Sequence, residues 1–240
     1  MRRILMAIIG ILGMVTLANA ASLCVNLQGT GPGGVVTMAD MIALGSDGCQ
    51  IDDKVFYDFG YVPGGSAPTA GEVTIGFDET PLDPGLVFTA GFAAVSGTTT
   101  TAKITYTVDV LPGGNPITDF SIGIGGITQN NPGAIFISED GCLGGTWNAS
   151  GSSCNSGNVA SLDIYIGPGA ANNQFDIAYF DPVLSVDIFK DITVIGGDGG
   201  LAKFSEMTQN FSEIPEPGTL ALLGGGLLIA GIASRRRYKR

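Results

Sequence analysis

The sequence predicts an all-β protein, an antiparallel β-sandwich with one short N-terminal helix, and a jelly roll is the alternative architecture. Apolar, aromatic and β-branched runs recur along the chain with turn residues between them. Several runs alternate with a period of two residues, as from Lys103 to Leu111, so that one face is apolar. Glycine is abundant, at 38 of 240 residues, and it clusters between the runs, as at 196–200. Together these features indicate strands that bury one face and are joined by glycine turns.

The elements follow from local signals. A helix is expected from Met38 to Leu44, because Thr37 and Asp40 have capping-box spacing and Gly45 follows the apolar residues. After this helix, we expect a sandwich of eight or nine strands. The candidate strand segments are Lys54 to Val62, Glu72 to Asp78, Leu86 to Val95, Lys103 to Leu111, Ile117 to Gly125, Ala134 to Ser138, Ala160 to Gly167, Leu184 to Ile195 and Leu201 to Phe211.

The first 20 residues have the features of a secretory signal peptide. Arg2 and Arg3 precede an apolar run at 4–17, and Ala18-Asn19-Ala20 has the small-x-small pattern of a cleavage site. An uncleaved N-terminal anchor is the alternative, but the run is short for a membrane span. We therefore expect residues 1–20 to be a signal peptide and residues 21–214 to be a single exported β-sandwich domain.

The C-terminal end predicts a single transmembrane helix. Residues 218–234 carry no charge, and as a helix they would extend roughly 25 Å at ~1.5 Å per residue, which is a short span. Five of the chain's eleven Lys and Arg residues follow at 235–240. The positive-inside rule places this basic tail in the cytoplasm and the preceding domain outside. A plain single-pass anchor with a proline-rich linker is the alternative.

Residues 215–240 resemble the PEP-CTERM sorting signal of Gram-negative bacteria. The resemblance comprises the motif Pro215, Glu216 and Pro217, the hydrophobic segment and the arginine-rich end, in that order. It implies that exosortase, a membrane-embedded cysteine transpeptidase, recognises the motif. It also implies transient anchoring in the inner membrane, then transfer to the cell surface or to an exopolysaccharide-rich matrix. The two prolines fix φ and withhold N–H groups, which keeps the motif extended ahead of the membrane.

Two segments of the exported part are similar to a recurrent class of PEP-CTERM ectodomains. They are residues 42–59 and residues 186–192, the latter followed by a glycine turn and a Phe-Ser stretch. The class has no assigned function, so this resemblance implies no active-site residues.

Charge narrows the possible partners. Residues 21–214 contain 21 acidic and four basic residues, a net charge of −17. Such a surface repels nucleic acid and anionic lipid. We attribute the acidity to solubility outside the cell rather than to calcium binding, because no segment has the spacing of an EF-hand or nonapeptide calcium repeat.

The chain has no histidine, which excludes several kinds of catalysis in cis. Ser-His-Asp and Cys-His nucleophiles and His-ligated zinc all need imidazole. Glycoside hydrolysis by a carboxylate pair stays possible. The adjacent pairs Asp52-Asp53 and Glu139-Asp140 lie beside Gly and Cys in turn-like contexts, so we expect solvated loop charges there. We therefore expect no enzymatic activity, no metal and no cofactor.

The four cysteines form two close pairs in the sequence. An even number in an exported chain indicates disulfides, and Cys24–Cys49 with Cys142–Cys154 is the simplest of the three connectivities. A zinc site is disfavoured, since there is neither a Cys-x-x-Cys motif nor a histidine.

Three functions of different class fit these features. The first is a structural or adhesive protein of the surface or biofilm matrix. The second is a carbohydrate-binding module with exopolysaccharide as a possible ligand, for which Trp147, in the loop between Cys142 and Cys154, is the candidate stacking platform. The third is a glycosidase based on carboxylates.

Overall fold

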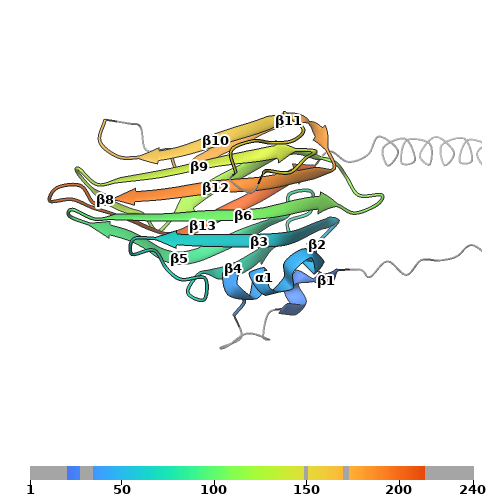
Figure 1. Cartoon of the computed structure of the whole chain (residues 1–240), viewed down its shortest axis with the longest axis horizontal. Coiled ribbons are helices and arrows are strands. Elements are labelled where there is room, and N and C mark those ends of the chain that lie inside the picture. The colour runs from blue at the N-terminus through green and yellow to red at the C-terminus, as the bar shows by residue number, and fades with distance from the viewer. Residues whose placement is uncertain (1–20, 28–34, 149–150, 170–172, 214–240) are drawn as a thin grey trace, which may run out of the picture.

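The computed structural model describes residues 21–27, 35–148, 151–169 and 173–213. They form two packed sheets with a short helix at one edge (Figure 1). Sheet A has the strand order β1-β2-β3-β6-β12-β9-β10, and sheet B has the order β11-β7-β13-β5-β4, with β8 added beside β13. All pairs are antiparallel except β1 with β2. The predicted antiparallel sandwich is confirmed.

The elements of the described chain follow in sequence order. The helical segments are η1 (Cys24–Leu27), α1 (Met38–Leu44) and η3 (Gly45–Asp47). The strands are β1 (Ser22–Leu23), β2 (Cys49–Ile51), β3 (Lys54–Gly64), β4 (Thr74–Asp78), β5 (Gly85–Val95), β6 (Thr99–Val110), β7 (Ile117–Gly125), β8 (Thr128–Asn130), β9 (Ala134–Leu143), β10 (Val159–Ile166), β11 (Phe175–Val183), β12 (Ser185–Ile195) and β13 (Leu201–Glu213).

All nine predicted strands form, but the expected total of eight or nine is too low. Four further segments, β1, β2, β8 and β11, also pair in the sheets. Three of them have only two or three residues, too few to show a period. The fourth, β11, is an edge strand in which Ala178 alone is buried, so it lacks an apolar face. The strand predicted at Ala134 to Ser138 continues to Leu143.

Helix α1 begins and ends as predicted. Thr37 is its N-cap, with the Thr37 side chain and the Asp40 carboxylate each bonded to the other's backbone N–H, and Gly45 is its C-cap. Met38 and Met41 are buried, which fixes the helix against the sandwich. Because seven residues are too few for a stable isolated helix, this packing stabilises it.

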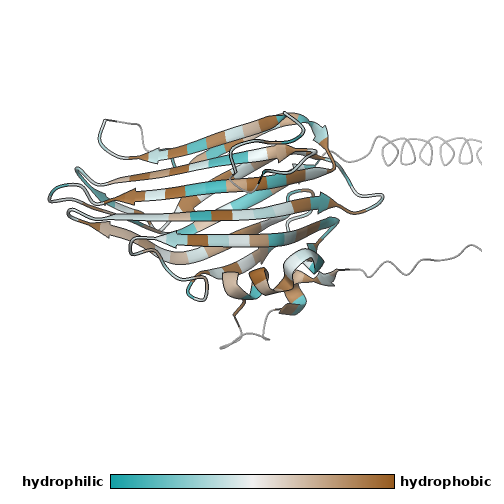
Figure 2. Cartoon of the chain, in the orientation of Figure 1, coloured by the Kyte–Doolittle hydropathy of each residue, from teal (hydrophilic) through white to brown (hydrophobic). Residues whose placement is uncertain are grey.

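The core lies between the sheets. Buried and less buried residues alternate along β12 without interruption, and Figure 2 shows the matching alternation of hydropathy along the strands. A bulge between Phe204 and Glu206 on β13 keeps the later apolar residues of that strand facing inward. Aromatic side chains fill much of the interior, namely Phe56, Phe88, Phe92, Tyr106, Phe120, Phe204 and Phe211.

Candidate functional site

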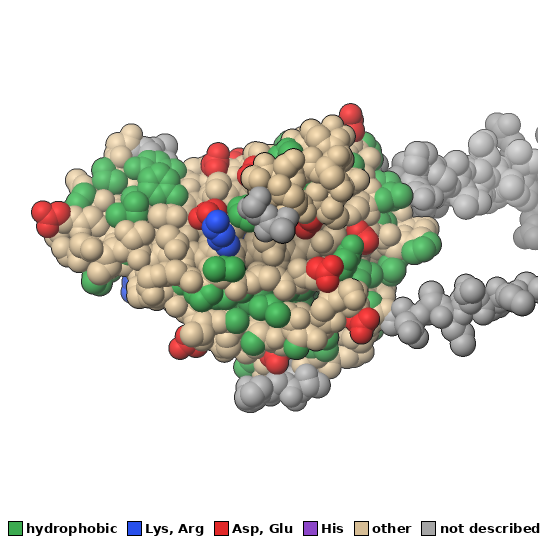
Figure 3. Space-filling model, viewed as in Figure 1, with side chains coloured by type: hydrophobic (Ala, Val, Ile, Leu, Met, Phe, Trp, Pro, Cys, Tyr) green, Lys and Arg blue, Asp and Glu red, His purple; other side chains and the backbone are tan. Residues whose placement is uncertain are grey.

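The outer face of sheet A carries the candidate binding site. On β12, the side chains of Asp187 and Phe189 point outward, between the buried neighbours Val186, Ile188 and Lys190. The face seen in Figure 3 carries scattered acidic side chains and little basic charge, in keeping with the composition. Such a face suits a neutral polar ligand better than a polyanion.

The loop between β9 and β10 is closed by a disulfide. Cys142 near the end of β9 bonds to Cys154, and Trp147 forms a β-bridge with Cys154 across the loop. The second bond joins Cys24 to Cys49, so the structure contains both predicted disulfides. The 12-residue separation of Cys142 and Cys154 closes a compact loop that carries Trp147.

Two hydrogen bonds fix Trp147 on the sheet. Its backbone N–H donates to Oδ2 of Asp187, and its indole N–H donates to the Asp187 carbonyl, each at 2.8 Å. The indole meets the Phe189 ring edge-on, with ring centroids 6.4 Å apart. Trp147 is half-buried, so one part of the ring system faces solvent.

Gly151 brings the same loop close to β12. Its φ of 70° lies in the left-handed region, and a Cβ at this position would overlap the Phe189 ring. Only glycine lets the loop backbone approach that ring. The backbone at Gly151 thus covers part of the Phe189 ring, and Trp147 flanks another part of the same ring.

Beside Trp147 lies a hollow of about 350 Å³, a volume that matches a small-molecule site. Strand β3 has a bulge between Tyr57 and Gly60, and the exposed Asp58 at this bulge has a φ of 53°. The bulge thereby places Asp58 at the hollow. The lining residues are Asp58, Thr105, Thr107, Thr146, Trp147, Asn148, Gly151, Asp187 and Phe189.

The carboxylate of Asp187 lies half-buried in the wall of the hollow. Burial raises its pKa, and repulsion from Asp58 and Asp109 adds to the rise, while hydrogen bonds from Trp147 and Thr107 oppose it. One of its oxygens accepts from the Trp147 N–H and the other accepts from the Thr107 hydroxyl at 3.2 Å. Asp187 therefore positions the tryptophan.

A second and larger hollow, of about 880 Å³, adjoins the first along β6. Asp109 lines it and is two residues beyond Thr107 of the smaller hollow, on the same face of the strand. The Tyr57 hydroxyl donates to Oδ2 of Asp109 at 2.9 Å. Burial, and then this carboxylate, raise the pKa of Tyr57 well above its usual range, so the phenol keeps its proton.

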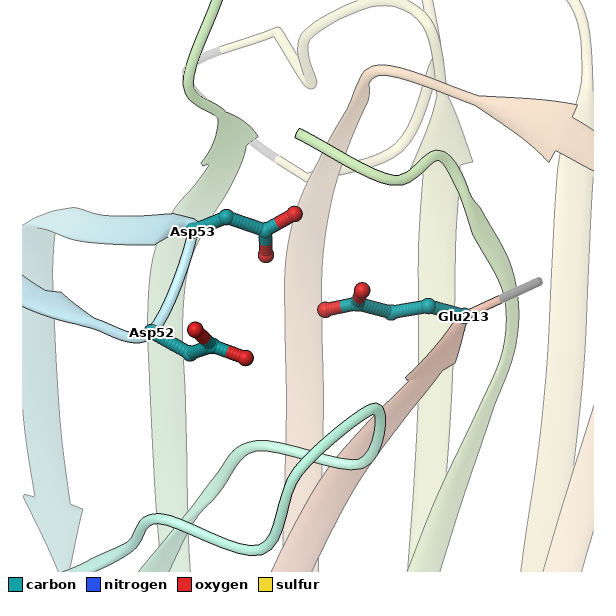
Figure 4. A group of neighbouring side chains, drawn as sticks. All are labelled: Asp52, Asp53 and Glu213. Atoms are coloured by element: carbon teal, nitrogen blue, oxygen red, sulfur yellow. The ribbon is translucent and has the colours of Figure 1, made fainter. Parts of the chain in front are cut away.

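The predicted loop charges Asp52 and Asp53 lie in the turn between β2 and β3, where Glu213 at the end of β13 faces them (Figure 4). Oxygens of the three carboxylates lie within 4.8 Å of one another. Lys54 supplies the cation: its Nζ donates to Asp53, to Oε1 of Glu213 at 2.5 Å and to the Asn115 carbonyl at 3.0 Å. A metal ion at this position would have to displace the ammonium group.

The prediction for Glu139 is wrong. It was expected to be a solvated loop charge, but it lies within β9, is fully buried and pairs with Lys190. Its partner is 51 residues away on β12, so no local pattern could indicate the pair. Asp140, the next residue, was also expected in a loop but lies within β9, on its outer face, where it accepts a hydrogen bond from Ser161.

Most of this site was missed by sequence reasoning. Trp147 was singled out, but Asp58, Asp187 and Phe189 were not. One available signal was Phe189, a large aromatic at an outward position of an alternating strand, which indicates that something covers it.

The predicted signal peptide at 1–20, the sorting motif Pro215, Glu216 and Pro217, and the predicted membrane helix at 218–234 lie outside the described residues. Within the ranges that the structure describes, no helix has the length and hydrophobicity needed to span a membrane.

Comparison with solved structures finds several proteins with weak overall likeness to this chain. The carbohydrate-binding module TmCBM61 in complex with β-1,4-galactotriose has a TM-score of 0.28 and 10% identity, covering 64% of this chain and 88% of its own. The enzymatically active domain of tailspike protein 4 of bacteriophage CBA120 has a TM-score of 0.27 and 16% identity, covering 70% of this chain and 21% of its own. The family 11 carbohydrate-binding module from Clostridium thermocellum, in complex with a β-1,3-1,4-mixed-linked tetrasaccharide, has a TM-score of 0.24 and 9% identity, with coverages of 66% and 91%. Likeness at this level bears on neither ligand nor activity.

Comparison with curated protein sequences gives no significant match. Comparison with protein families gives one match, the PEP-CTERM protein-sorting motif, over residues 213–237. The match begins at the last residue of β13 and includes Pro215, Glu216 and Pro217. The chain is thus a β-sandwich protein with a C-terminal PEP-CTERM protein-sorting motif.

Proposed function

We propose that this protein is exported, processed by exosortase and delivered to the cell surface or extracellular matrix, where it has a structural or adhesive role. The observation that carries the proposal is the sorting motif at 213–237, which starts where β13 ends. The disulfides Cys24–Cys49 and Cys142–Cys154 support it, because such bonds persist in oxidising compartments outside the cytoplasm.

The junction between sandwich and sorting motif is held in place. Glu213, the first residue of the matched motif, is buried and bonded to Lys54 at the start of β3. This ion pair fixes the end of β13 to the first hairpin. In the sequence, the Pro-Glu-Pro motif begins two residues after this fixed point.

A variant of Glu216 tests sorting. We expect the surface form of the wild-type protein to lack residues 218–240, and Glu216→Ala to stay in the inner membrane with these residues intact. Intact mass of each cell fraction measures this directly. Glu206→Ala is the matched control, since Glu206 is exposed on β13 and lies before the motif. Surface protein that retains residues 218–240 would contradict the proposal.

The hollow beside Trp147 favours a second candidate function, saccharide binding without turnover. Sugars bind where an aromatic ring adjoins hydroxyl and carboxylate groups, and here Trp147 adjoins Thr105, Thr107 and Asp58. The two hydrogen bonds to Asp187 hold the indole before any ligand arrives, so binding costs little side-chain entropy. Both carboxylate oxygens of Asp187 are already engaged, which supports a positioning role over catalysis.

A glycan array on the full exported protein tests this second function. We expect binding to neutral oligosaccharides, weakened by about tenfold or more, or ~1.4 kcal/mol, in Trp147→Ala. Tyr179→Ala is the matched control, because Tyr179 is 75% exposed on β11 of the other sheet. Equal binding by both variants would exclude the hollow as the site. Release of reducing ends that Asp58→Asn or Asp187→Asn abolishes would show a glycosidase instead.

A further inference from the structure

Three polar side chains lie buried in the core between the two sheets. Lys190 on β12 and Glu139 on β9 are paired directly across sheet A, and Gln209 comes from β13 of sheet B. All three have no exposed surface. Neither the outer-face hollow nor the sorting motif involves them, and a buried charged pair with an amide is costly unless every polar atom is bonded.

The contacts within this trio converge on one nitrogen. Nζ of Lys190 donates to Oε2 of Glu139 and to Oε1 of Gln209, so it lies beside the Gln209 carboxamide. The Phe88 ring centroid is 5.9 Å from Nζ, and the Tyr106 ring packs against Phe88. Lys190 thus faces a carboxyl group and a carboxamide in otherwise aromatic surroundings.

Several polar atoms of the trio and its surroundings are unsatisfied. Oε1 of Glu139, Nε2 of Gln209 and the hydroxyl of Tyr106 have no hydrogen-bond partner among the described residues. Each buried polar atom left in this way keeps the full cost of its removal from water. The unmodified side chains therefore form an unfavourable arrangement, and a reaction that removed one of these groups would relieve part of the cost.

Burial also favours the reactive forms of the two titratable groups. It lowers the pKa of Lys190 and raises the pKa of Glu139. Their mutual attraction opposes both shifts, and the adjacent Gln209 carboxamide also opposes the rise at Glu139. In a low-dielectric interior, an uncharged pair of amine and carboxylic acid avoids the desolvation cost of two ions. A neutral amine is a nucleophile, and a neighbouring carboxyl group can carry a proton.

We propose that Lys190 and Gln209 form an intramolecular amide bond between the two sheets, with Glu139 as the proton carrier. Nζ of Lys190 attacks Cδ of Gln209, and Glu139 protonates the carboxamide. The Nζ–Cδ bond forms and the Cδ–Nε2 bond breaks. Nε2 leaves as ammonia with a proton from the amine, passed through Glu139, which returns to its starting state. No oxidant or other reactant is needed.

The bond would link β12 of sheet A to β13 of sheet B. It closes a ring over the turn at 196–200 and removes Nε2 of Gln209, one of the unsatisfied atoms. Strand β13 leads directly into the sorting motif. The link would therefore also tie the C-terminal strand of the sandwich domain to the opposite sheet. A covalent link of this kind limits unfolding of a protein exposed outside the cell.

Peptide mapping of the full-length protein tests the proposal. After denaturation and reduction, trypsin should not cleave after Lys190, because an acylated lysine is not a substrate. The peptide 104–203 should then stay joined to the peptide that begins at Phe204, with a combined mass lower by one ammonia. Fragmentation should place the link at Lys190 and Gln209. Separate peptides 104–190 and 191–203 in the wild type would overturn the proposal.

Variants separate the roles of the three side chains. Glu139→Gln keeps Lys190 but should abolish the link. Lys103→Met removes an exposed lysine of sheet A and should leave the link intact. Folding of each variant is checked by its two disulfides and its circular dichroism. A mass lower by one water, with the link at Glu139, would show that Lys190 is bonded to Glu139 instead. That result would overturn the role of Gln209.

Discussion

Lys54 and Lys190 are both fully buried, yet their surroundings differ. Lys54 lies at the start of β3 and donates to two carboxylates and one backbone carbonyl, which uses all three ammonium hydrogens. Lys190 lies in the middle of β12, where one carboxylate and one carboxamide accept its hydrogens. Among the described residues, Oε1 of Glu139 and Nε2 of Gln209 have no partner, and beside Lys54 the same holds for Oε2 of Glu213.

This difference separates two uses of a buried lysine. Around Lys54, the carboxylates of Asp53 and Glu213 both accept from the ammonium group, and the ion pairs join the first hairpin to the last strand. Around Lys190, one carboxylate and one carboxamide accept from the ammonium group, and the described residues supply no third acceptor for it. The first lysine is suited to hold two segments together as an ion, and the second is suited to react as an amine.

The largest effect should come from removing the Lys54 charge. Lys54→Met leaves Asp53 and Glu213 facing each other without their cation. We expect the free energy of unfolding to fall by about 3–5 kcal/mol, as for one partner removed from a buried ion pair. Urea denaturation measures this.

Lys203→Met is the control for that measurement, since Lys203 is exposed on β13 and its loss should change stability by no more than about 0.5 kcal/mol. A loss below about 1 kcal/mol in Lys54→Met would mean that solvent compensates the two carboxylates, as for a surface pair. The distinction between the two lysines would then fail.

A smaller effect should appear in the pH dependence of stability. Burial acts to raise the pKa of Asp53. The contacts of its carboxylate with Lys54, Glu213 and the Asn115 N–H outweigh burial, so this pKa is lowered. Burial, reinforced by Asp53, raises the pKa of Glu213 despite the attraction of Lys54. The stabilisation from Asp53 is therefore present above its ordinary pKa and is lost as pH falls through the lowered value. The contribution of Glu213 is largest when it is protonated and declines as pH rises through the raised value.

Urea midpoints measured between about pH 3 and pH 7 test both signs. In Asp53→Asn, the free energy of unfolding should fall less steeply as the pH is lowered. In Glu213→Gln, it should fall less steeply as the pH is raised. If both variants keep the slopes of the wild type, the cluster around Lys54 does not titrate as described.

Patterns among neighbouring residues in the sequence predict much of the fold. The alternation in segments such as 103–111 predicts strands because side chains of a strand point to opposite faces in turn. Thr37, Asp40 and Gly45 predict the ends of α1, since capping groups act within a few residues of the helix. The disulfide pairs follow from cysteines that are close in sequence. Each of these signals needs only neighbouring residues.

The sequence by itself thus determined the sandwich class, the helix, the disulfides and the C-terminal sorting motif. Only the tertiary structure decided that Glu139 and Gln209 meet Lys190, and that Trp147 lies on Asp187 and Phe189. Such contacts depend on strand order and register, which join residues far apart in the chain. The residues next to a polar side chain in an alternating run look the same in the sequence in two cases. The side chain can meet a side chain of the opposite sheet, or it can face solvent. Its burial is therefore fixed by the packing of the two sheets.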